Sequence, residues 1–137
     1  MARMVPPYLS NKVKSVGEKQ LFERIRKAPG TEKWVVLHSL FLTRHVKRLY
    51  GEIDFLILAP ELGVFVLEVK SGNVSRKEGI WYYTDRFGNQ GSSTVGPFMQ
   101  AKDGMFTLKE EIKRKYGDND DLTKIIFGYG VIFPHMD

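Results

Sequence analysis

Two apolar runs around one turn, in residues 51–71, constrain the fold of this chain more than any other feature. The runs cover residues 53–58 and 64–70, and both are rich in β-branched and aromatic side chains. Pro60 and Gly63 lie between the runs and are typical turn residues. The stretch therefore predicts a β-hairpin.

The two-residue period of a strand divides the hairpin side chains between two faces. One face is wholly apolar, and the other is apolar except for charged residues at one end. Because both faces look buried, the hairpin is predicted to be a central pair of strands rather than an edge. The wholly apolar face comprises Ile53, Phe55, Ile57, Phe65, Leu67 and Val69, and the other begins with Leu56, Leu58, Val64 and Val66.

The charged end of the second face is a candidate metal site. Folding the hairpin about Glu61 places Asp54 opposite Glu68. The same register places Glu52 opposite Lys70. Directly opposed side chains have Cβ atoms about 4.5–5.5 Å apart, so two carboxylates there repel each other. A divalent cation with hard oxygen ligands would offset this repulsion, and a buried salt-bridge cluster around the lysine is the open alternative.

The composition fits one ordinary globular domain. The chain has 137 residues, of which 42% are hydrophobic and 27% are charged. Its net charge of +5 favours an anionic partner such as nucleic acid. The absence of cysteine excludes disulfides and thiolate metal sites. No apolar run is long enough for a signal peptide or a membrane span, so we expect an intracellular, cytoplasmic protein.

An extended arm and a helix are predicted before the hairpin. Residues 1–14 form the basic N-terminal arm, where Pro6 and Pro7 prevent a helix, and residues 15–137 form the single domain. A helix is predicted from Ser15 to about residue 28, with Glu18 at the capping-box position. Glu18 also lies on the inward face of this helix, so a cap and a functional role are both open.

Basic residues on either side of the hairpin are candidates for binding a phosphate backbone. Some belong to the connection at residues 43–50, directly before Glu52 and Asp54, and others to a predicted polar turn at residues 73–79. For any one of them, a solvated loop position is the alternative. The candidates are Arg44, Lys47, Arg48, Arg76 and Lys77.

The remaining elements complete an α/β pattern. Strands are predicted at residues 34–42, 80–84 and 124–133, a loop at residues 85–96, and a helix at residues 97–116 that ends at Gly117. The element order is helix, four strands, helix, strand, which predicts a mixed central sheet of about five strands flanked by two helices. A chain that stops soon after a buried strand is expected to be the N-terminal part of a longer protein.

Five short motifs occur in a defined order along residues 15–133. They are Gly17-Glu18, Glu52-Ile53-Asp54, Glu68-Val69-Lys70-Ser71, Gly79-Ile80-Trp81 and Pro97-Phe98-Met99-Gln100. This ordered set resembles the nuclease-related domain (NERD) family of the PD-(D/E)xK nuclease superfamily, although the superfamily's proline before the aspartate is absent. The resemblance implies a restriction-endonuclease-like core.

The resemblance also implies a metal-dependent nuclease that hydrolyses DNA phosphodiester bonds in DNA processing or repair. Asp54 and Glu68 would hold Mg²⁺ or Mn²⁺ together with the backbone carbonyl of Val69. Glu18 would complete the outer shell or reach the metal through water. The implied catalytic residues are Asp54, Glu68, Lys70, Glu18 and Gln100.

Two of these residues would act on the reacting groups. Lys70 would orient the attacking water or stabilise charge on the phosphate, and Gln100 would touch the phosphate or position the nucleophile.

The expected partners are DNA, with RNA as an open alternative, and a helicase or other domain C-terminal to this one. A homodimer is compatible with the resemblance. Two other functions remain open from the residues: a nucleic-acid-binding module that does not cut, and an interaction domain in which the acid–lysine cluster is only a buried ion network.

Overall fold

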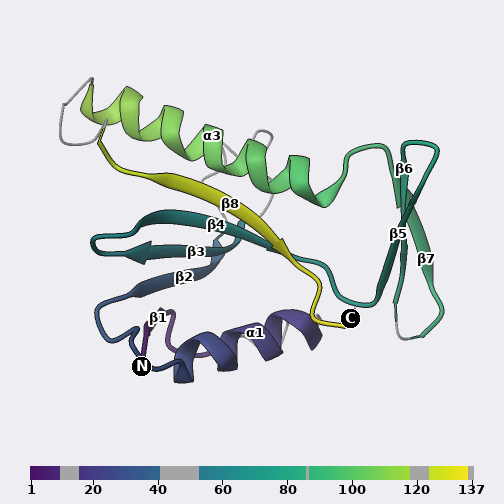
Figure 1. The fold of residues 1–137 in the computed structure, drawn as a ribbon, viewed down its shortest axis with the longest axis horizontal. Helices are drawn as coiled ribbons and strands as arrows, with labels where there is room; N and C mark the ends of the chain where they lie inside the picture. Colours follow the sequence, from purple (N-terminus) through teal and green to yellow (C-terminus); the bar gives the residue numbers. More distant parts are fainter. Residues whose placement is uncertain (10–15, 41–52, 86, 118–123, 136–137) are drawn as a thin grey trace.

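The computed structural model of the protein describes residues 1–9, 16–40, 53–85, 87–117 and 124–135. In chain order, its elements are β1 (Arg3–Val5), α1 (Val16–Lys27), β2 (Val35–Leu40), β3 (Ile53–Ala59), β4 (Gly63–Val69), β5 (Asn73–Lys77), β6 (Ile80–Thr84), β7 (Gln90–Ser93), α3 (Pro97–Tyr116) and β8 (Phe127–Ile132). Within these residues, β1-β2-β3-β4-β8 form a five-stranded mixed sheet. The helices α1 and α3 lie on opposite sides of this sheet (Figure 1). The predicted α/β architecture is confirmed.

The central hairpin has the predicted register. Phe55 pairs with Leu67 and Leu58 pairs with Val64, as expected for a hairpin folded about Glu61. β3 lies between β2 and β4, and β4 also pairs in parallel with β8. Both strands of the hairpin are therefore interior strands, because each has a neighbour on either side.

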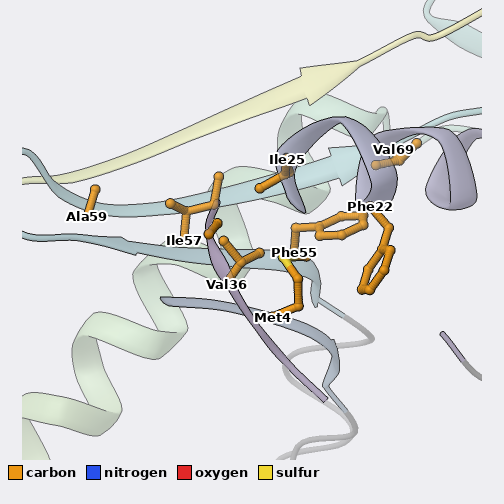
Figure 2. Close-up of a cluster of buried hydrophobic side chains, with 9 residues drawn as sticks. Met4, Phe22, Ile25, Val36, Phe55, Ile57, Ala59 and Val69 are labelled. Carbon is orange, nitrogen blue, oxygen red and sulfur yellow. The ribbon is translucent and has the colours of Figure 1, made fainter. Parts of the chain in front are cut away.

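One face of the sheet is covered by α1. Phe22 and Ile25 of the helix are buried against Val36 and Phe55, which are 0% and 1% exposed. Figure 2 shows these side chains together with Met4, which comes from β1. The 12-residue helix is thus fixed by an apolar stripe at helical spacing.

The other face of the sheet is covered by α3. Leu56, Val66 and Met105 form its buried core together with Ile53. The alternation of faces predicted that Ile53 would share a face with Phe55 and Ile57, which pack on the α1 side, and this prediction is wrong. The β3–β4 ladder ends at the pair of Phe55 and Leu67, whereas Ile53 still pairs with Leu40 of β2.

The N-terminal segment contributes a strand to the central sheet. β1 pairs in parallel with β2, and Arg3 lies opposite Val35. Ala2 and Met4 are 6% and 5% exposed, whereas Arg3 between them is exposed. The extended conformation expected for residues 1–14 therefore includes a strand that belongs to the core of the domain.

A second, three-stranded sheet replaces two predicted connections. The polar turn predicted at residues 73–79 is strand β5, and the loop predicted at residues 85–96 contains β7. β6 has the predicted bounds but pairs with β5 and β7, so its expected place in the central sheet is taken by β1. These short strands escaped prediction because their side chains are mainly polar and exposed, with Val74 as the buried exception in β5.

The long helix agrees with its predicted bounds. α3 covers Pro97–Tyr116, with Pro97 in the first turn. At its end the Gly117 amide donates a hydrogen bond to the Lys113 carbonyl at 2.7 Å, and Gly117 has a φ of 73°.

No helix in the described part of the chain is long and apolar enough to cross a membrane.

Several predictions concern residues that lie outside the described ranges. They are the Ser15 cap, the Glu52 partner of Lys70, and the basic residues Arg44, Lys47 and Arg48.

Candidate active site

The candidate site lies at one end of the central sheet. β4 and β8 finish there, and α1 and α3 both begin there (Figure 1). The Gly17 amide at the start of α1 donates a hydrogen bond of 2.9 Å to the Ser71 hydroxyl, just beyond β4. A Cβ atom on Gly17 would overlap Ser71 and Pro134, so glycine is needed for this close approach. Two of the five sequence motifs meet at this contact.

A second contact joins two further motifs at the same end. Trp81 of β6 packs directly on Gly96, where a Cβ atom would overlap the indole ring. The ring of Phe98 in the first turn of α3 lies 6.2 Å from that of Trp81, measured between centroids. Phe98 lies 6.1 Å from Phe133, which follows β8. This row of aromatic side chains fixes the second sheet beside the end of the central sheet.

The acidic pair spans the ends of β3 and β4. Asp54 Oδ2 accepts a hydrogen bond of 2.8 Å from the Val69 amide. Lys70 Nζ lies 3.2 Å from Glu68 Oε1, and the two side chains are 25% and 13% exposed. Val69 between them points into the α1-side core, so Glu68 and Lys70 share the opposite face of the strand. The structure thus brings Asp54, Glu68 and Lys70 together at the predicted end of the hairpin. Asp54 and Glu68 are not a pair of the β3–β4 ladder, and Asp54 instead accepts the hydrogen bond from the Val69 amide.

Glu68 is electrostatically unfavourable in its charged form. Burial, and after it the negative charge of Asp54, raise the pKa of Glu68 to about 7. The charge of Lys70 and its hydrogen bond act in the opposite direction without cancelling this shift. A second positive charge at this position would relieve the repulsion between the two carboxylates.

The donor atoms fit a hard divalent cation. The amide and the carbonyl of one strand residue point to the same neighbouring strand. Because the Val69 amide faces Asp54, its carbonyl faces the same side. Mg²⁺ is commonly held by one or two carboxylates while it keeps several waters. Within the described residues no group of three or more His, Cys, Asp or Glu side chains could hold a metal.

The other two predicted catalytic residues lie in the first turns of the helices. Glu18 follows Gly17 and is half-buried, at the end of the sheet where Glu68 lies. Gln100 lies in the first turn of α3, and its side chain is exposed. It is therefore more open to solvent than the partly buried Glu68.

Two of the predicted phosphate-binding residues are described, and both belong to β5. Arg76 and Lys77 are exposed on this strand of the second sheet. The Arg76 guanidinium lies 5.7 Å from the centroid of the Trp81 ring, which anchors the sheet to α3. Two cations therefore lie on the sheet that adjoins the candidate site.

The structure adds one residue that the sequence did not single out. Tyr83 of β6 has its ring centroid 5.4 Å from Lys70 Nζ. Burial raises the pKa of the Tyr83 hydroxyl. The charge of Lys70 lowers this pKa in part, and the charge of Glu68 raises it further. The available signal was the shared face of Trp81 and Tyr83 in β6, but nothing in the sequence showed that this face adjoins Lys70.

The fold and the site define an α/β protein with a restriction-endonuclease-like core. Compared with models of known families, the chain matches the nuclease-related domain, NERD, over residues 14–133. The chain therefore belongs to the nuclease-related domain family of the PD-(D/E)xK superfamily, as its motifs predicted. Searches of the curated proteins and of the solved structures found no match.

Proposed function

We propose that this domain is a metal-dependent nuclease that hydrolyses the phosphodiester bonds of DNA. The observation that supports this most directly is the pair of carboxylates, Asp54 and Glu68, held beside Lys70 at a partly buried strand end. Membership of a nuclease-related family supports the same reading. We further propose that the activity serves DNA processing or repair.

The acidic pair would hold Mg²⁺ or Mn²⁺. Asp54, Glu68 and the Val69 carbonyl would supply hard oxygen ligands, and Glu18 would join through water. When bound, such an ion acts as a Lewis acid that polarises the phosphate and makes water more acidic. The repulsion that raises the pKa of Glu68 is the feature of the chain that favours cation binding.

Lys70 would act on the reacting groups themselves. Its ammonium would orient the attacking water or stabilise the charge that develops on the phosphate. A bond from water oxygen to phosphorus forms as the bond to the leaving oxygen breaks. The attacking water releases a proton to solvent, and the leaving oxygen takes up a proton from solvent. Gln100, exposed at the start of α3, would contact the phosphate.

The surroundings of the site favour a polyanionic substrate. The chain carries a net charge of +5, and Arg76 and Lys77 are exposed on the adjoining sheet. Both helices begin at the site end, and the partial positive charge of a helix N-terminus favours phosphate. Arg76 and Lys77 would contact the phosphate backbone of DNA without recognising its base sequence.

Cleavage of labelled single-stranded, double-stranded and branched DNA tests the proposal. Reactions with Mn²⁺, Mg²⁺ or EDTA would compare the wild type with Asp54→Asn and Lys70→Ala. We expect cleavage that requires metal and that falls about 100-fold or more in each variant. Asp103→Asn and Lys102→Ala, which change exposed residues of α3, serve as matched controls and should cleave like the wild type. DNA binding without metal-dependent cleavage would instead identify a binding module.

A further inference from the structure

Lys70 lies between two different partners. On one side its ammonium is 3.2 Å from Glu68 Oε1. On the other it is 5.4 Å from the centroid of the Tyr83 ring, within the range of a cation–π contact. Tyr83 is the fourth residue of β6, where it pairs with Val74 of β5 and Gly91 of β7. The second sheet therefore supplies one side of the lysine's surroundings.

We infer that Tyr83 is a positioning residue of this site, whose aromatic ring holds the Lys70 ammonium when Glu68 is engaged by a divalent cation. The part of this inference that concerns catalysis rests on the proposed function. Its structural part, that the ring holds Lys70 without help from Glu68, can be tested separately.

The need for a second partner follows from the chemistry of the acidic pair. Glu68 is both the ion-pair partner of Lys70 and a proposed metal ligand. A metal ion competes for the same carboxylate oxygens and weakens their attraction for the ammonium. The electron-rich face of an aromatic ring attracts a cation independently of that carboxylate. A long, flexible lysine side chain needs such a contact to keep its ammonium in one place.

The ring and the hydroxyl of Tyr83 can be separated by substitution. The hydroxyl oxygen is buried and has no hydrogen-bond partner in the part of the chain that the structure describes. Removing it in Tyr83→Phe leaves the ring face in place and takes away a buried polar group that forms no such bond. Tyr83→Leu removes the ring itself while keeping an apolar side chain.

Steady-state kinetics with a labelled DNA substrate and Mg²⁺ gives the first test. We expect Tyr83→Phe to keep kcat within about twofold of the wild type and Tyr83→Leu to lose about tenfold, with KM for DNA nearly unchanged in both. Tyr82→Leu is the matched control, because Tyr82 directly precedes Tyr83 in β6 and is exposed on the other face. Far-ultraviolet circular dichroism would establish that each variant is folded.

Nuclear magnetic resonance of the ¹³C-lysine-labelled protein gives a second test that needs neither cleavage nor metal. The ε-methylene signal of Lys70 is assigned by its loss in Lys70→Arg. A proton above a ring face is shifted upfield, so we expect this shift in the wild type and in Tyr83→Phe. It should persist in Glu68→Gln, which removes the ion pair, and disappear when Tyr83→Leu is added to that variant.

The outcomes separate the inference from the proposed function. A wild type that cleaves no DNA would overturn the proposed function, while the resonance experiment still decides whether the ring holds Lys70. The inference itself fails if Glu68→Gln alone moves the Lys70 signal to that of an exposed lysine. It also fails if Tyr83→Leu cleaves like the wild type, or if Tyr83→Phe is as impaired as Tyr83→Leu.

Discussion

Glu68 combines two effects that both disfavour its charge. The side chain is 13% exposed, and Asp54 adds a second negative charge to its surroundings. Its pKa of about 7 in the folded protein exceeds the ordinary value of 4.5. The folded state therefore binds more protons than the unfolded state between these two pH values. Stability of the metal-free protein should therefore rise as the pH falls from about 7 towards 4.5. Above about pH 7, the destabilisation of the folded state by the charged Glu68 side chain is fully present.

We expect Glu68→Gln to stabilise the metal-free protein at pH 8, by an amount of the order of 2 kcal/mol, because the amide carries no charge to bury. The gain should shrink at pH 5, where the wild-type carboxyl is protonated in the folded state. Urea denaturation in EDTA at both pH values measures the difference in the free energy of unfolding between the variant and the wild type. Metal-dependent cleavage should be lost in the same variant.

Glu110→Gln is the matched control for this experiment, because Glu110 is exposed on α3 and its substitution should change stability little. If Glu68→Gln instead lowers stability at pH 8, the carboxylate is held favourably by Lys70. The acid–lysine cluster would then be a net-stabilising ion pair, as one of the sequence-based alternatives supposes.

At the scale of elements, β1 shows how a short segment joins a core. Its three residues pair with β2 at the edge of the central sheet, and Met4 packs with Phe22 and Phe55. The sequence signal was two apolar residues, Ala2 and Met4, on either side of Arg3. Such a brief alternation does not distinguish a strand from an extended arm, because the pairing partner lies far along the chain.

We expect Met4→Ala to lower the free energy of unfolding by about 2–4 kcal/mol, because it removes a buried side chain from a packed core. Arg3→Ala, one residue away and exposed, should change stability by less than about 0.5 kcal/mol. Urea denaturation of both variants measures the difference. Equal stabilities of the two variants would mean that β1 is not docked in solution.

At the scale of the whole molecule, two pairs of basic residues lie far apart, and their contributions to DNA binding can be compared. Arg76 and Lys77 lie on the sheet beside the candidate site. Lys113 and Lys115 lie in the last turn of α3. A helix of 20 residues is about 30 Å long, so these two pairs of cations are well separated. Replacing either pair changes the net charge equally, which separates local contact from overall attraction.

We expect Arg76→Ala with Lys77→Ala to reduce the slope of log Kd for DNA against log salt concentration by about 2, since two phosphate contacts are lost. The same change at Lys113 and Lys115 should reduce it by less than about 1. Fluorescence anisotropy with labelled DNA across a salt series measures both slopes. Equal slopes in the two double variants would show that DNA does not lie along the second sheet.

The sequence by itself determined the central hairpin and the acid–lysine cluster at its end. A turn and two apolar strands fix the register, because a slip by one residue would turn every buried side chain to the other face. The hairpin places Asp54 and Glu68 at the same end, and helical spacing with Pro97 and Gly117 bounded α3. These features depend on residues close in the chain, where local chemistry leaves few alternatives.

Only the tertiary structure decided which distant segments meet at the site. The close approach of Gly17 to Ser71 and the contact of Trp81 with Gly96 depend on how whole elements pack. The separate sheet that carries Tyr83 to Lys70 also has no local signal, because its outer strands are short and largely polar. Contacts between residues far apart in the chain are selected by the packing of the whole core, and a local pattern of side chains does not encode that choice.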